Sequence, residues 1–122
     1  MKFSDLGLSD ELSRAVADLG YKNPTPIQEK SIPVVLMGRD ILGSAQTGTG
    51  KTAAFGLPII EKINTKKNLP QSIILCPTRE LCLQITKDFE SFSKYIKNLK
   101  ITAVYGGANI QSQIRSVASE LI

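Results

Sequence analysis

Residues 45–52 read Ala45-Gln46-Thr47-Gly48-Thr49-Gly50-Lys51-Thr52. Gly48 and Gly50 let the backbone take positive φ and approach a phosphate chain closely. The amides that follow would converge at a helix N-terminus, where the helix dipole favours an anion. The spacing therefore predicts a phosphate-binding loop, with Lys51 reaching the β and γ phosphates and the Thr52 hydroxyl ligating Mg²⁺. The common pattern begins with Gly, and Ala45 fits that position as the last residue of a strand.

Strands and helices are expected to alternate on both sides of this loop. Short apolar runs at residues 40–45, 72–77 and 101–105 predict three strands. Helical spacing and capping residues predict five helices, over residues 10–19, 26–37, 51–63, 79–97 and 110–121, with Pro58 disturbing the third. Alternation of this kind predicts an α/β fold, with a parallel sheet and helices on both faces. Functional loops in such folds lie at the carboxyl ends of the strands.

Bulk composition limits the class of protein. The chain has 122 residues and a formal net charge of +4, enough for one domain with a core. It shows no apolar run long enough to cross a membrane and no signal sequence at Met1–Asp5. With two cysteines and no histidine, free thiols in a reducing cytoplasm are expected rather than a disulfide framework or a metal site. The basic excess in residues 62–100 suits either a nucleic acid or a solvated helix face with a Lys-rich loop.

A second candidate site precedes the phosphate loop. Gln28 carries a donor and an acceptor that match adenine N6 and N7. Phe3 and Tyr21 can offer aromatic faces to a purine, and Asn23 lies in the same Pro-stiffened segment. The competing interpretation is a capping box, in which Gln28 returns to the amide of Thr25. The residues alone leave both interpretations open.

A third group of residues follows the second and third predicted strands. Pro77, Thr78 and Arg79 open a helix whose N-terminus and guanidinium suit a phosphate. Gly106 and Gly107 allow a close backbone approach. Such groups would contact a nucleic-acid backbone without reading its bases. Alternatively, Arg79 pairs with Glu80 or caps a helix end, and the two glycines form an ordinary turn.

In combination, these motifs resemble those of DEAD-box RNA helicases, and residues up to Ile60 look most similar to bacterial members. Phe3 with residues 20–28 resembles the adenine-recognising Q motif, and residues 45–52 resemble motif I. Residues 77–81 resemble motif Ia, and Gly106-Gly107 resembles the paired-glycine motif. The resemblance implies a RecA-like P-loop NTPase domain that uses ATP and Mg²⁺ and binds single-stranded RNA through sugar and phosphate. It assigns residues 1–38 to the Q-motif region and 39–122 to the P-loop and RNA-backbone region.

The family's later motifs have no counterpart in these 122 residues. Asp-Glu-Ala-Asp, Ser-Ala-Thr and a second lobe with an arginine finger are all missing. We therefore expect a truncated N-terminal portion of the first RecA-like domain, inactive in hydrolysis by itself. Two rival classes are a small P-loop kinase, which would leave Phe3, Gln28 and residues 77–81 unexplained, and a non-catalytic module that retains ATP.

Overall fold

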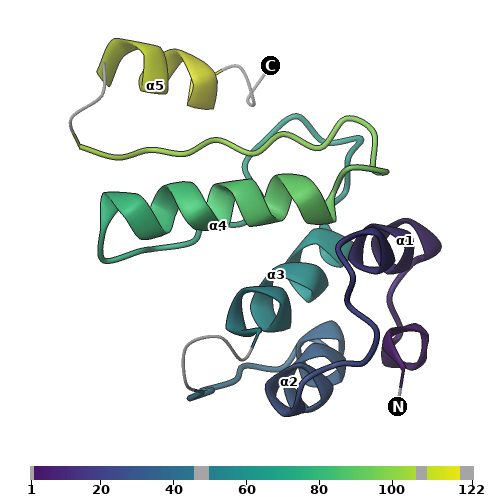
Figure 1. Ribbon diagram of the computed structural model, residues 1–122. Coiled ribbons are helices and arrows are strands. Elements are labelled where there is room, and N and C mark those ends of the chain that lie inside the picture. Colours follow the sequence, from purple (N-terminus) through teal and green to yellow (C-terminus); the bar gives the residue numbers. More distant parts are fainter. Residues whose placement is uncertain (1, 46–49, 107–109, 119–122) are drawn as a thin grey trace.

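The computed structural model describes residues 2–45, 50–106 and 110–118. That part of the chain forms six helical elements: η1 (Phe3–Leu6), α1 (Asp10–Asp18), α2 (Pro26–Leu36), α3 (Lys51–Lys62), α4 (Arg79–Phe92) and α5 (Ile110–Ala118). The helices α1 to α4 gather against one another, and the chain that follows α4 runs between α4 and α5 (Figure 1). No helix in the described ranges is long and apolar enough to span a membrane.

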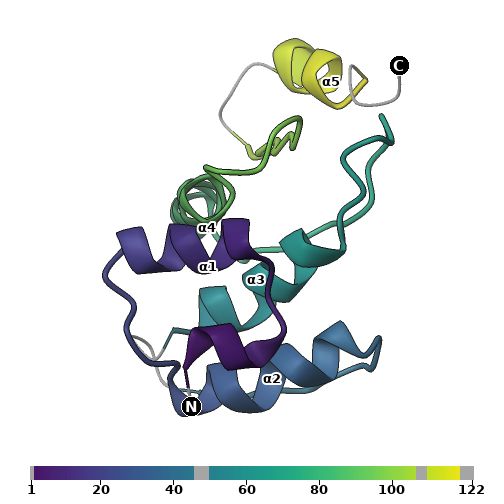
Figure 2. The same cartoon turned by 90° about the vertical axis from the view of Figure 1, so that its right-hand side faces the viewer.

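One apolar core joins the first four α-helices. Leu12 of α1, Ile32 of α2, Leu57 of α3 and Phe92 of α4 are each less than 2% exposed. Burying a side chain of this size contributes about 1.5–3 kcal/mol relative to leaving it in water. The most extensive helix contact is between α2 and α3, which lie next to each other below α4 and α1 in Figure 2. This packing fixes the N-terminus of α3, where the phosphate loop ends.

Close packing of α3 against α4 depends on Gly56. A Cβ atom at this position would lie 2.8 Å from Cε1 of Phe89, a buried residue of α4. Pro58, in the same helix, is buried and does not interrupt it, because α3 continues to Lys62. The predicted helix at 51–63 is therefore confirmed, and the expected disturbance at Pro58 is wrong.

Local capping sets the helix starts as the sequence predicts. The Ser9 hydroxyl accepts from the amide of Leu12 at 3.4 Å, and the Thr78 hydroxyl accepts from the amide of Leu81 at 3.1 Å. Each bond satisfies an N–H that the helix itself leaves free. The starts of α1 and α4 are therefore confirmed. The sequence also predicts that Asn109 caps α5, and that residue lies outside the described residues.

The end of α4 is not where the sequence predicts it. The helix stops at Phe92 instead of about Lys97. The Ser93 hydroxyl donates to the carbonyl of Phe89 at 2.8 Å, and Asn98 takes a left-handed φ of 65°. Serine side chains that bond to the preceding turn compete with helix continuation. Ile96, which matches the helical pattern, instead packs on the core from the following segment.

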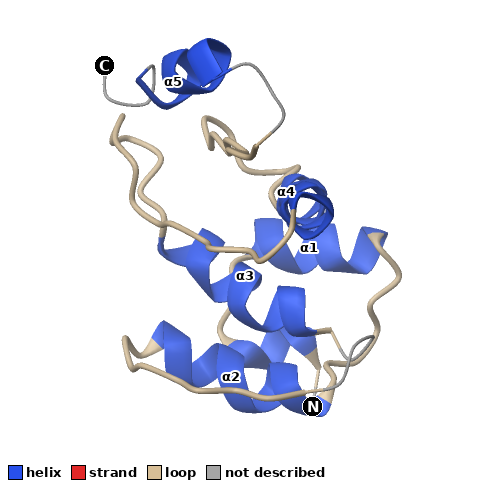
Figure 3. Cartoon of the chain, turned by 90° about the vertical axis from the view of Figure 1, so that its left-hand side faces the viewer, coloured by secondary structure: helices blue, strands red, loops and turns tan. Residues whose placement is uncertain are grey.

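The predicted sheet is not confirmed. Residues 40–45, 72–77 and 101–105 form no strand in the structure, and they are drawn as loop in Figure 3. Leu42, Ile73 and Leu75 have exposed fractions of 101%, 84% and 87%. A groove of about 560 Å³ lies between the 72–76 and 98–104 segments. These segments keep the apolar composition of buried parallel strands, but no neighbouring strand in the described residues pairs with them.

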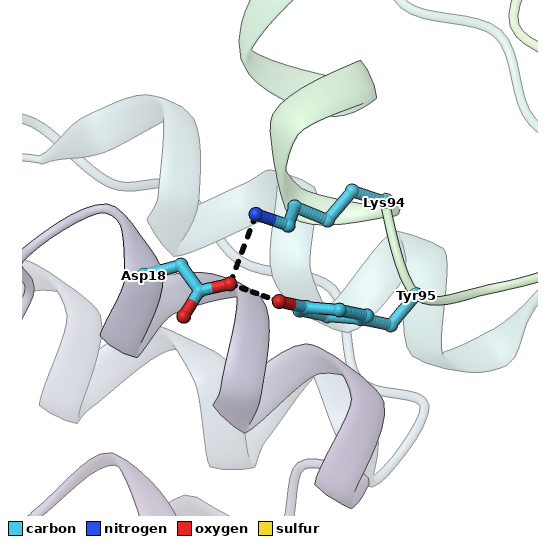
Figure 4. Close-up of polar contacts among 3 residues, drawn as sticks. All are labelled: Asp18, Lys94 and Tyr95. Atoms are coloured by element: carbon cyan, nitrogen blue, oxygen red, sulfur yellow. Dashed lines mark hydrogen bonds and ion pairs between the residues drawn. The ribbon is translucent and has the colours of Figure 1, made fainter.

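A polar cluster joins α1 to the turn after α4 (Figure 4). The Asp18 carboxylate accepts from the Tyr95 hydroxyl, and its Oδ2 atom lies 2.9 Å from Nζ of Lys94. The guanidinium carbon of Arg14 lies 4.4 Å from the Tyr95 ring centre. The hydrogen bond from Tyr95, followed by the one from Lys94, lowers the pKa of Asp18, and the bond to Asp18 raises the pKa of Lys94. The cluster thus fixes the N-terminal helix beside α4.

Candidate nucleotide site and nucleic-acid edge

The phosphate loop ends at the N-terminus of α3. Gly50 caps this helix with a left-handed φ of 82°, Lys51 is exposed, and Thr52 is half-buried in the first turn. Free amides and the dipole of a twelve-residue helix favour an anion at this end. Ala45 is half-buried on the other side of the loop. The intervening Gln46, Thr47, Gly48 and Thr49 lie outside the described residues.

Gln28 connects the start of α2 to this loop. Its Oε1 atom accepts from the amide of Thr25 at 2.9 Å, and its Nε2 atom donates to the carbonyl of Gly50 at 3.2 Å. The first bond is the one that the capping-box interpretation predicts. The second joins Gln28 to the anion-binding end of α3. The side chain is 2% exposed and keeps one N–H and one lone pair beyond these two bonds. The cap and the bond to Gly50 therefore leave one donor and one acceptor of this amide unused.

Only glycine fits at position 50 beside Gln28. A Cβ atom on Gly50 would lie 2.2 Å from Nε2 of Gln28, and positive φ is unfavourable for residues with a side chain. The same Cβ position lies 3.3 Å from the Thr25 hydroxyl oxygen. That oxygen is buried and faces the backbone N–H of Gln28 in the capping box at the start of α2.

The predicted aromatic residues lie together near η1. The Phe3 and Tyr21 rings stack with centroids 6.1 Å apart, and Tyr21 meets Phe92 edge-on at 6.5 Å. Phe3 is 5% exposed, whereas Tyr21 is 39% exposed and Asn23 is also exposed. Burial, followed by the charge of Asp88, raises the pKa of Tyr21. Tyr21 is thus the exposed aromatic residue of this pair, while Phe3 packs beneath it in the core.

A second edge is built from the start of α4 and the segment before α5. Pro77, Thr78 and Arg79 are exposed there, and Thr78 caps the helix. The guanidinium carbon of Arg79 lies 5.0 Å from the centre of the Tyr105 ring. This cation–π contact holds Arg79 against Tyr105, the residue that immediately precedes Gly106. No ion pair between Arg79 and Glu80 forms in the described residues. Gly106 is exposed, and a Cβ atom added there would meet no other atom within 4 Å, whereas Gly107 lies outside the described residues.

Two residues of this edge are absent from the sequence-based candidates. Gln113 of α5 accepts from the amide of Tyr105 at 3.0 Å and donates to the carbonyl of Tyr105 at 2.9 Å. Gln113 is 8% exposed, so both bonds are sheltered from water. The position of Tyr105 next to the paired glycines is a signal that could have identified it. Gln113 has no comparable signal, because its role depends on a contact across 8 residues of chain.

The sequence is similar to those of known helicases. A profile for the DEAD/DEAH box helicase family matches residues 25–122. The chain is 54% identical over 117 residues to a protein of Limosilactobacillus reuteri named ATP-dependent RNA helicase CshA, covering 96% of this chain and 23% of that protein. The namesake from Listeria monocytogenes is 51% identical over 116 residues, covering 95% of this chain and 22% of that protein. The chain thus spans under a quarter of the length of these curated relatives.

Solved structures also resemble the chain. A DEAD box protein from Methanococcus jannaschii superimposes with a TM-score of 0.90 and 44% identity, over 96% of this chain and 32% of that one. S. cerevisiae Dbp5 bound to RNA and ADP BeF3 superimposes with a TM-score of 0.80 and 30% identity, over 87% of this chain and 29% of that one. These neighbours confirm that the chain is part of a RecA-like helicase domain, although the described residues contain no strand. Together with the sequence matches, they confirm the resemblance drawn from the motifs.

Proposed function

Because the chain belongs to the DEAD/DEAH box helicase family, we propose that it is the ATP-binding portion of an ATP-dependent RNA helicase, an enzyme that hydrolyses ATP to remodel RNA. Residues 1–38 form its Q-motif region, and residues 39–122 form its P-loop and RNA-backbone region. The observation that carries the proposal is the bond from Gln28 to Gly50, which joins the adenine-reading segment to the phosphate-binding end of α3.

The two ends of the nucleotide are recognised by different elements. Lys51, exposed at the first position of α3, supplies a point charge to the β and γ phosphates. The remaining N–H and lone pair of Gln28 read the adenine edge, and Tyr21 offers an aromatic face. Gly48 and its neighbours complete the phosphate cradle. Since Gln28 also bonds to Gly50, the N-cap of α3, base recognition and phosphate binding are mechanically joined.

A single side chain, Thr52, is proposed to bind Mg²⁺, and the phosphates of the nucleotide would supply further ligands. No group of three or more His, Cys, Asp or Glu side chains that could bind a metal forms in the described part of the chain. The Thr52 hydroxyl in the first turn of α3 is a hard oxygen ligand of the kind that Mg²⁺ prefers. When bound, the ion neutralises charge on the phosphates during phosphoryl transfer. Thr52 would hold the ion, and Lys51 would add a second positive charge beside it.

RNA is proposed to bind along the second edge, at Pro77, Thr78, Arg79, Gly106 and Gly107. The helix N-terminus and the Arg79 guanidinium suit phosphates, and none of these groups is arranged to read a base. We therefore propose that the chain binds RNA through its backbone, independently of RNA sequence. We propose no membrane as a partner. Support comes from the similarity to Dbp5, whose structure was solved with RNA bound. The two free cysteines are in keeping with a reducing cytoplasmic location.

The test is steady-state phosphate release by the protein that contains this chain, with and without RNA. We expect RNA to stimulate turnover and Lys51→Ala to abolish it. The 122-residue chain by itself should not hydrolyse ATP, because transition-state stabilisation by an arginine finger is worth on the order of 10³–10⁵ in rate. Phosphate transfer to a small-molecule acceptor, without RNA stimulation, would point to a kinase; nucleotide binding without turnover would point to a regulatory module.

A further inference from the structure

The Arg79 guanidinium lies against an aromatic ring and not against a carboxylate. Its carbon atom is 5.0 Å from the centre of the Tyr105 ring, and Arg79 is exposed at the start of α4. A carboxylate partner would neutralise the guanidinium and accept its N–H groups. A ring attracts the cation through its π face, so the charge and the N–H donors stay available for phosphate oxygens.

The ring that meets Arg79 is itself held in place by α5. The Gln113 side chain accepts from the amide of Tyr105 at 3.0 Å and donates to the carbonyl of the same residue at 2.9 Å. Gln113 is buried and Tyr105 is half-buried, so water competes weakly for these two bonds. Because one side chain binds both backbone polar groups of Tyr105, the backbone there has little freedom to turn the ring away from the arginine.

The residue before Tyr105 is attached to α4 as well. The Cys82 thiol donates a long hydrogen bond, 3.9 Å, to the carbonyl of Val104. Cys82 lies three residues after Arg79 in α4, and residues at this spacing are neighbours on a helix surface. Two contacts of different kinds therefore join the consecutive residues 104 and 105 to the first turn of α4.

We propose that Tyr105 and Gln113 are positioning residues for RNA binding: the Tyr105 ring orients the Arg79 guanidinium toward a phosphate, and Gln113 holds the ring. This inference rests on the function proposed above, in which Arg79 contacts the RNA backbone. Neither Tyr105 nor Gln113 needs to touch the RNA. A long, exposed side chain loses rotamer freedom when it binds a ligand, and a neighbour that restricts it beforehand reduces that loss.

A direct contact between the Tyr105 ring and an RNA base is the competing role for this residue. Aromatic side chains do stack on the bases of single strands. The Tyr105 ring, however, is half-buried and already has the Arg79 guanidinium beside it. A stacked base would act without Arg79, whereas a positioning ring acts only through it. The two roles therefore differ in how substitutions at residues 79 and 105 combine.

The experiment measures the affinity of the full-length protein for two unrelated single-stranded RNA sequences. The variants are Arg79→Ala, Tyr105→Leu and the two combined. Tyr105→Leu removes the π face and should weaken binding to both RNAs by roughly two- to fivefold, the equivalent of an exposed cation–π contact. Tyr105→Phe keeps the π face and should bind as the wild type does. In the Arg79→Ala background, Tyr105→Leu should cause no further loss, because no guanidinium is left to orient.

Gln113 is tested in the same assay. Gln113→Leu retains a side chain of similar size but loses both bonds to Tyr105, so it should weaken RNA binding by a similar factor, and only when Arg79 is present. Ile114→Ala, which changes an exposed residue of the same helix, is the matched control. ATP affinity measured without RNA should be the same in all of these variants. The Tyr105 variants leave the Gln113 side chain in place, so their result stands even where Gln113→Leu lowers the melting temperature.

The outcomes separate the positioning role from the proposed function. An equal loss from Tyr105→Leu with and without Arg79 would overturn positioning and give the ring a direct RNA contact. Equal losses from Tyr105→Phe and Tyr105→Leu would also overturn it. If Arg79→Ala weakens RNA binding and Tyr105→Leu does not, the RNA edge stands and positioning alone fails. If Arg79→Ala binds RNA as tightly as the wild type, the proposed RNA edge is wrong and the positioning role fails with it.

Discussion

The side-chain amide of Gln28 donates a hydrogen bond to the carbonyl oxygen of Gly50, 22 residues farther along the chain. The same amide accepts from the backbone of Thr25. One residue thus caps α2 and holds the N-cap residue of α3. The capping-box and adenine-binding interpretations of Gln28 are therefore compatible, and substitutions can separate the two roles.

Gln28→Glu should remove base discrimination while it keeps the cap. A carboxylate oxygen can still accept from Thr25, but it offers no N–H to Gly50 or to adenine. We expect the preference for ATP over GTP to fall by about 1–3 kcal/mol, as for loss of a bidentate base contact. Gln28→Ala should in addition lower the melting temperature, because the cap is lost. Competition binding and melting curves measure both effects, with the exposed Gln84→Ala as control. Unchanged ATP preference in both variants would leave Gln28 with only the capping role.

Lys51→Ala should weaken ATP binding by tenfold or more. A hydrogen bond to a charged group contributes about 1.5–3 kcal/mol, and no described residue in the first turn of α3 replaces this cation. Titration calorimetry gives the dissociation constant directly. Lys62→Ala, at the opposite end of the same helix, is the matched control and should bind ATP normally. Equal affinities for the two variants would contradict the assignment of the phosphate loop.

Arg79→Ala should weaken RNA binding by a similar factor for every RNA sequence. Removing one phosphate contact should also reduce the slope of log K against log salt by about 1. Filter binding at several salt concentrations, with unrelated RNA sequences, provides both quantities. Lys87→Ala removes an exposed charge from the same helix and serves as control. A loss confined to particular sequences would show that Arg79 contacts bases.

Asp18→Asn should lower the melting temperature in a pH-dependent way. The pKa of Asp18 is lowered in the folded state, first by the hydrogen bond from Tyr95 and then by Lys94, so its contribution is present above the unfolded value of about 3.9 and disappears as pH falls through the folded value. The pKa of Lys94 is raised, so its part is present below about 10.4 and disappears as pH rises through the folded value. The difference between wild type and variant should thus be full at pH 7 and should shrink as the pH falls below the unfolded pKa of Asp18, about 3.9.

The control for this cluster is Asp40→Asn, which alters an exposed carboxylate outside it. Because both groups of the pair are partly solvated, the melting difference should be small and should shrink at high salt. A difference that stays constant from pH 7 to pH 2 would mean that Asp18 acts only through neutral hydrogen bonds.

Helix starts could be predicted because their causes are local. Ser9 and Thr78 bond to amides three residues ahead, and Pro26 suits the first position of α2. The end of α4 was less predictable, since the apolar spacing of Ile96 continues past the serine bonds that stop the helix. The spacing of apolar residues shows which face of a segment can be buried, but it does not determine the residue at which the helix ends.

Contacts between distant segments account for what the sequence did not predict. The bond between Gln28 and Gly50 and the pairing of Gln113 with Tyr105 both need a three-dimensional arrangement that no local pattern encodes. The expected strands at 72–77 and 101–105 have the right composition, but strand pairing requires a neighbour at the right distance and register. Phe3 was expected to face a purine, and its burial beneath Tyr21 could be recognised only from the packing of η1.

Two hydrogen bonds between the Gln113 side chain and the backbone of Tyr105 attach α5 to the segment before it. A side-chain amide that both accepts from and donates to one residue imitates the hydrogen bonding of a neighbouring strand, so Tyr105 is held to a rigid helix. On its other side, the Tyr105 ring lies 5.0 Å from the guanidinium carbon of Arg79. Tyr105 therefore links the start of α4 to α5, two segments that no extensive helix-to-helix packing joins directly among the described residues.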